Sequence, residues 1–325
     1  MDGLRVGAMF RCRAEPEALQ PFARRVEALG YDELWLVEDC FYAGGVASAA
    51  AALAATERVA VGLGILPAVM RNPAAAAMEL AALARLFPGR VLPGFGHGVA
   101  AWMRQIGALP RSQLAALGET ITAVRALLAG ETVTMRGAHV DLDAVRLDHP
   151  PRRAPPVFAG VRGPRSLELS GRVADGTVLA ELSSPAYVRW AREQVDRGRA
   201  RAGRVDRHRL TVYVLLGLGA SELRAVRAQV AGALLAGSLQ LGPSSSTEAA
   251  ELATLAARAP NLTTLAAELP DSQVERLAVA GDPAGCARTL QRFGEAGADA
   301  VVLVPPPDPD AALRQLEQAA GQLPR

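Results

Sequence analysis

The chain has 325 residues, half of them apolar, and 35 basic against 33 acidic side chains give a formal net charge of +2. This length and apolar content suffice for one large domain with a closed core, and the dispersed, near-neutral charge argues against nucleic-acid binding. The widely spaced Cys12, Cys40 and Cys286 suggest neither a disulfide framework nor a metal site, which favours a reducing cytoplasm. No signal peptide and no apolar run of membrane-spanning length is recognised.

Short apolar, β-branched runs alternate with longer amphipathic runs along the chain. Strands are predicted at residues 4–10, 33–37, 59–65, 91–94, 157–159, 177–179, 210–216 and 300–304. Helices are predicted between them, with examples at 16–29, 73–86, 111–128, 166–173 and 185–202. Near-continuous apolar strands are typical of a parallel sheet covered on both faces. Eight such units favour an α/β fold of the (β/α)8 TIM-barrel type, with an open doubly wound sheet as the alternative.

Two segments interrupt the alternation. Residues 131–147 are predicted as a small hairpin that turns at Arg136-Gly137, and residues 241–275, which include Pro243-Ser244-Ser245-Ser246, as an inserted helical excursion. Insertions after barrel strands commonly shape the active site, because the loops at the carboxyl ends of the strands carry it. We therefore predict a single domain over residues 1–325 with these two insertions.

Several enzyme classes lack their required motifs in this sequence. It contains no G-x-x-x-x-G-K-[ST], no H-E-x-x-H and no G-x-S-x-G pattern, which argues against P-loop, zinc-protease and serine-hydrolase chemistry. The four histidines show no metal-ligand spacing, so no metal site is predicted. The segment Gly94–Gly98 does not fit G-x-G-x-x-G, which weakens a dinucleotide-binding interpretation.

The candidate functional residues lie where the predicted strands end. Glu38 and Asp39 follow the second strand, where carboxylates can orient a cofactor or relay a proton, or can simply begin a solvated loop. Gly64 and Ile65 end the third strand. A glycine at this place indicates either a bulge close to a ligand or a plain turn.

The fourth predicted strand leads into Gly96, His97 and Gly98. Backbone without side chains suits close contact with a flat ring or a phosphate, and His97 is either a general acid or an ordinary hydrogen-bonding residue. An apolar group follows this loop and either walls a substrate pocket or packs a helix; it consists of Val99, Trp102 and Met103.

The fifth predicted strand leads directly into a helix start. The residues of interest are Gly160, Val161, Gly163, Pro164, Arg165 and Ser166. Glycines, a proline at the first helical position and arginines favour an anion site built from backbone N–H groups and the helix dipole. We interpret this segment as phosphate-binding in preference to a plain turn.

Together these segments resemble the luciferase-like monooxygenase superfamily and, within it, the coenzyme F420-dependent (deazaflavin) branch, which includes methylenetetrahydromethanopterin reductase. The resemblance runs from Val6 to about Leu313. It is carried by Gly30–Trp35, Gly64–Pro67, Arg71–Pro73, Gly94–Gly98, Gly160–Leu169, Val173–Gly176, Gly281–Pro283 and Pro307–Asp310.

The resemblance implies hydride transfer between the reduced deazaflavin, coenzyme F420, and a C=C, C=N or C=O bond of a small organic substrate. It implies a bulge with a cis peptide at Gly64–Ile65 behind the cofactor ring, where Gly64→Val harms hydride transfer more than folding. It also implies phosphate contacts from Gly160, Val161 and residues 163–166.

The family's carboxylate–histidine pair carries over to Glu38 and Asp39, so its usual histidine is missing. This leaves Asp39, His97 or the substrate to supply the proton. The glutamate of the sugar-phosphate branch is replaced by Val99, which argues against a sugar-phosphate substrate. An FMN-dependent monooxygenase and a non-catalytic cofactor-binding barrel remain as alternatives. The family is usually homodimeric, and we expect a homodimer through the Ala-rich segments 46–55 and 73–86.

Overall fold

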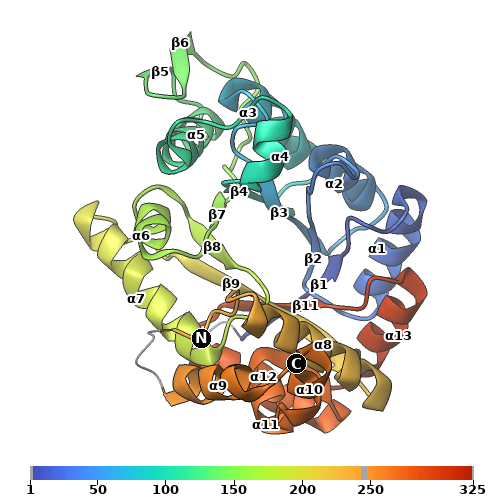
Figure 1. The fold of residues 1–325 in the computed structure, drawn as a ribbon. Helices are drawn as coiled ribbons and strands as arrows, with labels where there is room; N and C mark the ends of the chain where they lie inside the picture. Colours follow the sequence, from blue (N-terminus) through green and yellow to red (C-terminus); the bar gives the residue numbers. More distant parts are fainter. Residues whose placement is uncertain (1–2, 243–246, 324–325) are drawn as a thin grey trace.

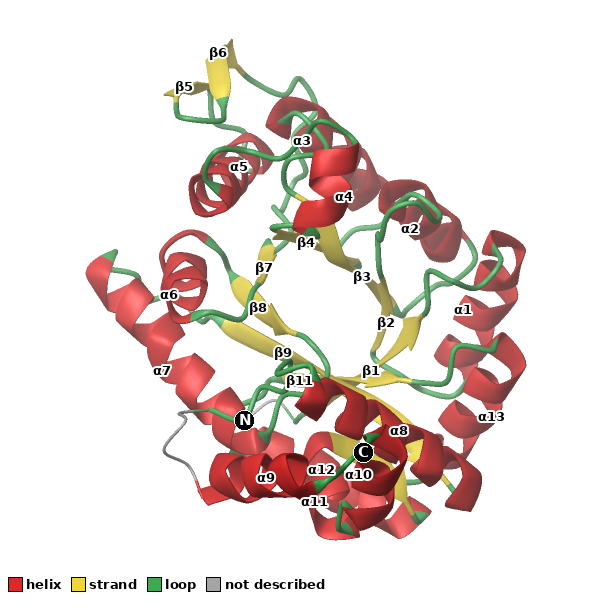
Figure 2. Cartoon of the chain, in the orientation of Figure 1, coloured by secondary structure: helices red, strands yellow, loops and turns green. Residues whose placement is uncertain are grey.

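The computed structural model describes residues 3–242 and 247–323. Its centre is a closed ring of eight parallel strands surrounded by helices (Figures 1 and 2). In order around the ring the strands are β1 (Arg5–Phe10), β2 (Glu33–Leu36), β3 (Ala60–Pro67), β4 (Val91–Gly96), β7 (Phe158–Gly160), β8 (Gly176–Leu179), β9 (Arg209–Leu218) and β11 (Ala300–Val304). The pairing of β9 with both β8 and β11, and of β11 with β1, closes the barrel. The predicted TIM barrel is confirmed, and the open sheet was the wrong alternative.

A further strand, β10 (Ala278–Gly281), was missed by the sequence analysis. It pairs in parallel with the end of β9, from Leu215 to Leu218. Only four residues long and rich in small side chains, it has too little β-branched character to stand out between two helices.

The five example helices are present close to their predicted ends. The helices around the ring are α1 (Leu19–Ala28, preceded by the 3-10 turn η1, Pro16–Ala18), α2 (Gly45–Ala54), α3 (Pro73–Leu86), α4 (Ala100–Gln105), α5 (Gln113–Leu128), α6 (Pro164–Val173), α7 (Pro185–Arg201), α8 (Ala220–Leu235), α12 (Pro283–Glu295) and α13 (Pro309–Ala320). Proline begins α3, α6, α7, α12 and α13, and side chains such as Asn72 and Ser184 cap first-turn N–H groups. These local signals explain why the helix starts were readable from the sequence.

Both interrupting segments have the expected kind of structure. Strands β5 (Val133–Arg136) and β6 (Asp141–Val145) form an antiparallel hairpin, which projects from the edge of the molecule in Figure 2. Helices α9 (Thr247–Arg258), α10 (Leu262–Glu268) and α11 (Asp271–Leu277) form the second segment and pack with α8. Residues Pro243-Ser244-Ser245-Ser246 of this predicted excursion lie outside the described residues. The single-domain boundary stays a prediction.

The inside of the barrel is filled by aromatic side chains. Trp35 makes edge contacts with Phe158 and Tyr213, at centroid distances of 5.7 and 5.8 Å. Such edge-to-face packing adds to the stabilisation that comes from burying these large side chains. These three side chains, Trp35, Phe158 and Tyr213, are called the aromatic plug below.

Candidate functional site

A pocket of about 300 Å³ opens at the carboxyl ends of the strands. Tyr213 reaches it from inside the barrel, Gly64 and Ile65 line it from β3, and Gly160 lines it from β7. Active sites of TIM barrels lie at this end, because the βα loops that carry functional groups converge there. The pocket is therefore the candidate site.

Strand β3 is irregular where it borders the pocket. Its pairing with β4 shifts register between Leu63 and Leu66, and the peptide between Gly64 and Ile65 is cis. This is the geometry that the resemblance implied. A second cis peptide, which was not expected, joins Cys40 and Phe41.

Two of the predicted cofactor-binding glycines pack against Ile65 in the structure. A β-carbon at Gly96 would lie 2.7 Å from Cγ1 of Ile65, and one at Gly160 would overlap Cγ2 of the same side chain. These glycines make room for Ile65. Ile65 itself is half-buried, and Gly160 also lines the pocket.

Gly64 cannot carry a side chain in this packing. A β-carbon there would overlap the buried hydroxyl of Tyr213. We therefore expect Gly64→Val to destabilise the fold as well, because the β-branched side chain must displace part of the aromatic plug. The expectation that hydride transfer suffers more than folding stays a prediction.

Glu38 is fully engaged by protein groups. Arg71 donates to its two oxygens at 2.6 and 2.7 Å, and the N–H of Gly45 donates to Oε2 at 2.6 Å. Its side chain is only 5% exposed. Glu38 thus ties the loop after β2 to the loop after β3, and it positions Asp39 without facing the pocket itself.

Asp39 is the carboxylate that lines the pocket. Burial is the largest cause that raises its pKa above the ordinary value; a hydrogen bond from Cys12 opposes this shift and the nearby Glu181 adds to it. The Cys12 thiol lies 3.6 Å from Oδ2, and burial raises its own pKa to about 11, so it remains a donor. Asp39 is therefore suited to hold a proton that can be passed to a substrate.

Sequence reasoning missed Cys12 and Glu181. Both line the pocket, Cys12 just after β1 and Glu181 just after β8. Their position at the carboxyl ends of predicted strands was a usable signal, but it becomes specific only when the barrel closes and brings the two strand ends together.

The structure brings together two segments that were predicted separately. His97, in the loop after β4, lies with Nε2 3.0 Å from Oγ of Ser166 and Nδ1 3.2 Å from the carbonyl oxygen of Gln113. Burial lowers the pKa of His97. Both ring nitrogens of His97 are engaged by protein groups, and the residue does not line the pocket, whereas Asp39 does. Asp39 is therefore the better-placed candidate for proton transfer.

The start of α6 has the features of an anion site. Gly163 is the N-cap and carries no capping side chain, and Pro164 is the first helical residue. Arg165 is exposed and forms no ion pair with any residue in 3–242 or 247–323. First-turn N–H groups, a hydroxyl and a guanidinium are the donors that a phosphate requires.

The three side chains predicted to form an apolar pocket wall differ in their exposure to solvent. Met103 is fully buried on α4 and packs beneath Gly98, Trp102 is half-buried, and Val99 is 47% exposed. The 300 Å³ pocket is lined by other residues. A substrate-binding role for these three side chains stays a prediction.

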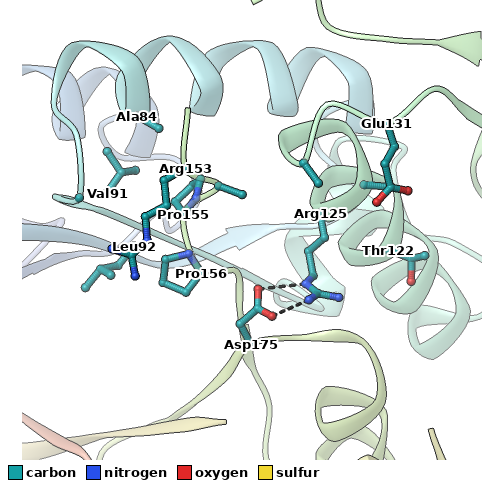
Figure 3. Close-up of a pocket in the computed structure, with 14 residues that line it drawn as sticks. Ala84, Val91, Leu92, Thr122, Arg125, Glu131, Arg153, Pro155, Pro156 and Asp175 are labelled. Atoms are coloured by element: carbon teal, nitrogen blue, oxygen red, sulfur yellow. Dashed lines mark hydrogen bonds and ion pairs between the residues drawn. The ribbon is translucent and has the colours of Figure 1, made fainter. Parts of the chain in front are cut away.

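A larger cavity, of about 730 Å³, lies at the opposite end of the barrel (Figure 3). It is bordered by residues at or just before the starts of strands, among them Val91, which begins β4, and Pro156, which precedes β7, and by Arg125 of α5. Arg125 donates to both oxygens of Asp175, at 2.6 and 2.9 Å. The active sites of TIM barrels lie at the carboxyl ends of the strands, so we assign a stabilising role to this ion pair at the amino ends.

In the described part of the chain, no helix has the length and apolar character needed to cross a membrane. The same residues contain no group of three or more His, Cys, Asp or Glu side chains placed to hold a metal. All three cysteines are free thiols.

Residues 5–300 match the family model described as luciferase-like monooxygenase. Over 184 residues the chain is 32% identical to a 5,10-methylenetetrahydromethanopterin reductase of Methanolobus tindarius, covering 56% of each chain. Over 205 residues it is 33% identical to an F420-dependent glucose-6-phosphate dehydrogenase of Microbacterium testaceum, covering 58% of this chain and 60% of that one. The chain thus spans little more than half the length of these relatives in the matched regions.

The fold is shared with a solved structure over almost its whole length. The coenzyme F420-dependent tetrahydromethanopterin reductase from Methanopyrus kandleri superposes with a TM-score of 0.78, and the match covers 98% of both chains at 19% identity. At this identity the likeness shows the fold.

Proposed function

The chain belongs to the luciferase-like monooxygenase family, and on that premise we propose that it is a coenzyme F420-dependent oxidoreductase. It transfers a hydride between the reduced deazaflavin and a C=C, C=N or C=O bond of a small organic substrate. The names of the glucose-6-phosphate dehydrogenase relative and of the superposed reductase support the choice of cofactor. The observation that carries the proposal is the pocket at the carboxyl ends, where the β3 bulge meets a carboxyl group able to hold a proton.

The residues present fit a flat cofactor with a phosphate. The branched surface of Ile65 borders the pocket next to Gly160 and Val161, and this side-chain-poor wall suits a planar ring. Arg165 and Ser166 at the start of α6 supply donors for the phosphate. When bound, the deazaflavin supplies the hydride, which is chemistry that no side chain can provide.

The protein's own part is proton handling and orientation. Asp39 holds the proton at Oδ1 or Oδ2 with its Cys12 contact, and it passes that proton to the substrate atom that becomes basic when the hydride arrives. The Glu38–Arg71 ion pair fixes the loop that presents Asp39. In the reverse direction the ionised Asp39 accepts the proton of an alcohol or amine.

Titration of the purified protein with F420 and with FMN, followed by absorption and fluorescence, tests the cofactor. We expect saturable binding of F420 and no binding of FMN. Binding of FMN alone would replace the proposal with an FMN-dependent monooxygenase. Tight F420 binding without turnover across carbonyl, imine and enone panels would favour a non-catalytic cofactor-binding barrel.

We also propose a homodimer that forms through α2 and α3. Two large apolar side chains of α3 face solvent, with Met78 64% and Leu86 71% exposed, and such patches commonly mark protein interfaces. Light scattering should give twice the chain mass, and Met78→Glu should give a monomer that still binds cofactor. The free thiols of all three cysteines support a reducing, cytoplasmic location.

A further inference from the structure

The hydrogen bonds of His97 decide where its proton lies. A carbonyl oxygen can only accept, so the contact with Gln113 places a proton on Nδ1. With the pKa of the imidazole lowered by burial, Nε2 is unprotonated at pH 7 and must accept. Its partner is the hydroxyl of Ser166, 3.0 Å away. The single proton of that hydroxyl is therefore directed at His97.

This arrangement conflicts with anion binding at the start of α6. A serine hydroxyl has one donor and two acceptor lone pairs. If the Ser166 proton points to His97, lone pairs face the site at which a phosphate oxygen must bind, and the contact is repulsive. If the hydroxyl turns to donate to the phosphate, Nε2 of His97 loses its donor while it remains half-buried.

Protonation of His97 removes the conflict. An imidazolium donates from Nδ1 to Gln113 and from Nε2 to the Ser166 oxygen, so that the hydroxyl proton is free for the anion. The added positive charge also favours the phosphate. We propose that His97 is a positioning residue for Ser166 and that it takes up one proton when the phosphate of the cofactor binds at the start of α6.

The charges around His97 do not already supply this effect. Arg104 lies on α4, Arg111 precedes α5, and α6 carries Arg165 and Glu168. Within residues 3–242 and 247–323, however, the imidazole has hydrogen-bonding partners only in Gln113 and Ser166. Glu168 is occupied by an ion pair with Arg201. Among the described residues, therefore, no carboxylate pairs with His97 to hold it protonated before the anion arrives.

The inference rests on the proposed cofactor, and its test does not need turnover. Calorimetric titration with F420 in buffers of different ionisation enthalpy gives the number of protons taken up. Between the pKa of His97 in the free protein and its higher value in the complex, the wild-type protein should take up close to one proton. Its Kd should then rise up to about tenfold per pH unit.

The matched variant is His97→Gln, whose side-chain amide donates to the Ser166 oxygen without taking up a proton. It should bind F420 with a Kd that is nearly independent of pH over the same range, and proton uptake should fall by the wild-type amount. Comparison of the two proteins cancels any titration of the cofactor itself. His149→Gln, at an exposed histidine distant in sequence from the site, should behave as wild type.

A second measurement uses sulfate, an oxyanion that does not titrate near neutral pH. The imidazole resonance of His97, assigned as the one of four histidine signals lost in His97→Gln, should titrate at higher pH when sulfate is added. In Ser166→Ala the sulfate-induced shift should be clearly smaller, because only the direct attraction between sulfate and the imidazolium remains. F420 binding with equal proton uptake in wild type and His97→Gln would overturn the inference alone, whereas absence of F420 binding would overturn the proposed function with it.

Discussion

The two ends of the barrel differ in how their charged groups are satisfied. At the amino ends, buried Glu33 is paired with Arg5 and Arg209, and Asp175 is paired with Arg125 and Arg204. At the carboxyl ends, Glu38 is likewise paired with Arg71, but Asp39, which lines the pocket, has in the described part of the chain only the Cys12 thiol as a side-chain hydrogen-bond partner. Among the described residues, the side chains of Glu181 and Arg165 form no hydrogen bond and no ion pair.

This difference in pairing indicates that the charged groups at the amino ends serve stability and that the unpaired ones at the carboxyl ends serve binding. Removing water from a charged group is costly unless a partner compensates, so paired charges can be buried and unpaired ones stay accessible. A side chain left without a protein partner at the functional end is available to a ligand. Substitutions at the amino ends should therefore lower stability, and those at the carboxyl ends should change binding or turnover.

The largest effect is expected for Glu33→Ala at the amino end. It leaves the half-buried Arg209 without its carboxylate and removes the acceptor of the Trp35 N–H, a bond of 2.8 Å. Removing one partner of a buried ion pair costs about 3–5 kcal/mol. Urea unfolding should show this loss of stability. At urea concentrations too low to unfold it, the variant should bind F420 with the wild-type Kd. The exposed Glu57→Ala is the control and should be neutral.

Gly64→Val is an exception to this comparison, because Gly64 lines the pocket at the carboxyl ends and yet its substitution should lower the stability of the fold. The new side chain overlaps the Tyr213 hydroxyl inside the aromatic plug, and overpacking of this kind costs about 1–3 kcal/mol. Denaturant unfolding should show the loss in the absence of cofactor. If the variant unfolds at the wild-type midpoint, the aromatic side chains make room for the valine without loss of stability. Gly64 would then matter for hydride transfer alone.

Asp39→Asn should remove proton transfer while leaving the fold intact. General acid catalysis contributes about 10²–10⁴-fold, so turnover should fall by at least about 100-fold with KM nearly unchanged. Because Asp39 acts in its protonated form and burial raises its pKa, wild-type reduction should slow as pH rises through that pKa. The rate of the variant should not show this decrease with rising pH.

The stability of Asp39→Asn has a definite sign. A carboxyl whose folded-state pKa is raised favours folding below its unfolded pKa and disfavours it once ionised at higher pH. The neutral amide should therefore unfold no more easily than wild type at pH 7. A marked loss of stability would place Asp39 among the structural charges instead.

Arg165→Ala should weaken cofactor binding by about 1.5–3 kcal/mol, the usual contribution of a hydrogen bond to a charged group. Arg165 is exposed at the start of α6, so the unfolding midpoint should not move. Fluorescence titration with F420 measures the change. An unchanged Kd would remove this residue from the phosphate site, and Arg172→Ala, in the last turn of the same helix, is the matched control.

The smallest effect is expected for Asn72→Ala, which tests whether loops at the carboxyl end carry any stability. The Asn72 side chain accepts the N–H of Ala74 and caps α3. Loss of such a cap costs about 1 kcal/mol. Urea unfolding should show this small shift with F420 binding retained.

The sequence by itself determined the eight barrel strands, the example helices and the rim position of Asp39. These features rest on local patterns: apolar runs mark buried parallel strands, and prolines with capping side chains mark helix starts. The family resemblance likewise indicated the irregularity of β3, because it was carried by residues adjacent in the chain.

Only the tertiary structure decided how distant side chains pair. The engagement of Glu38 by Arg71, the room that Gly96 and Gly160 make for Ile65, and the contact of His97 with Ser166 join different βα units. Closing the barrel fixes these partners, because each residue type could have satisfied its hydrogen bonds or its packing in several other ways. A linear pattern shows which residues reach the rim, whereas ring closure determines which of them meet a partner and which remain free for a ligand.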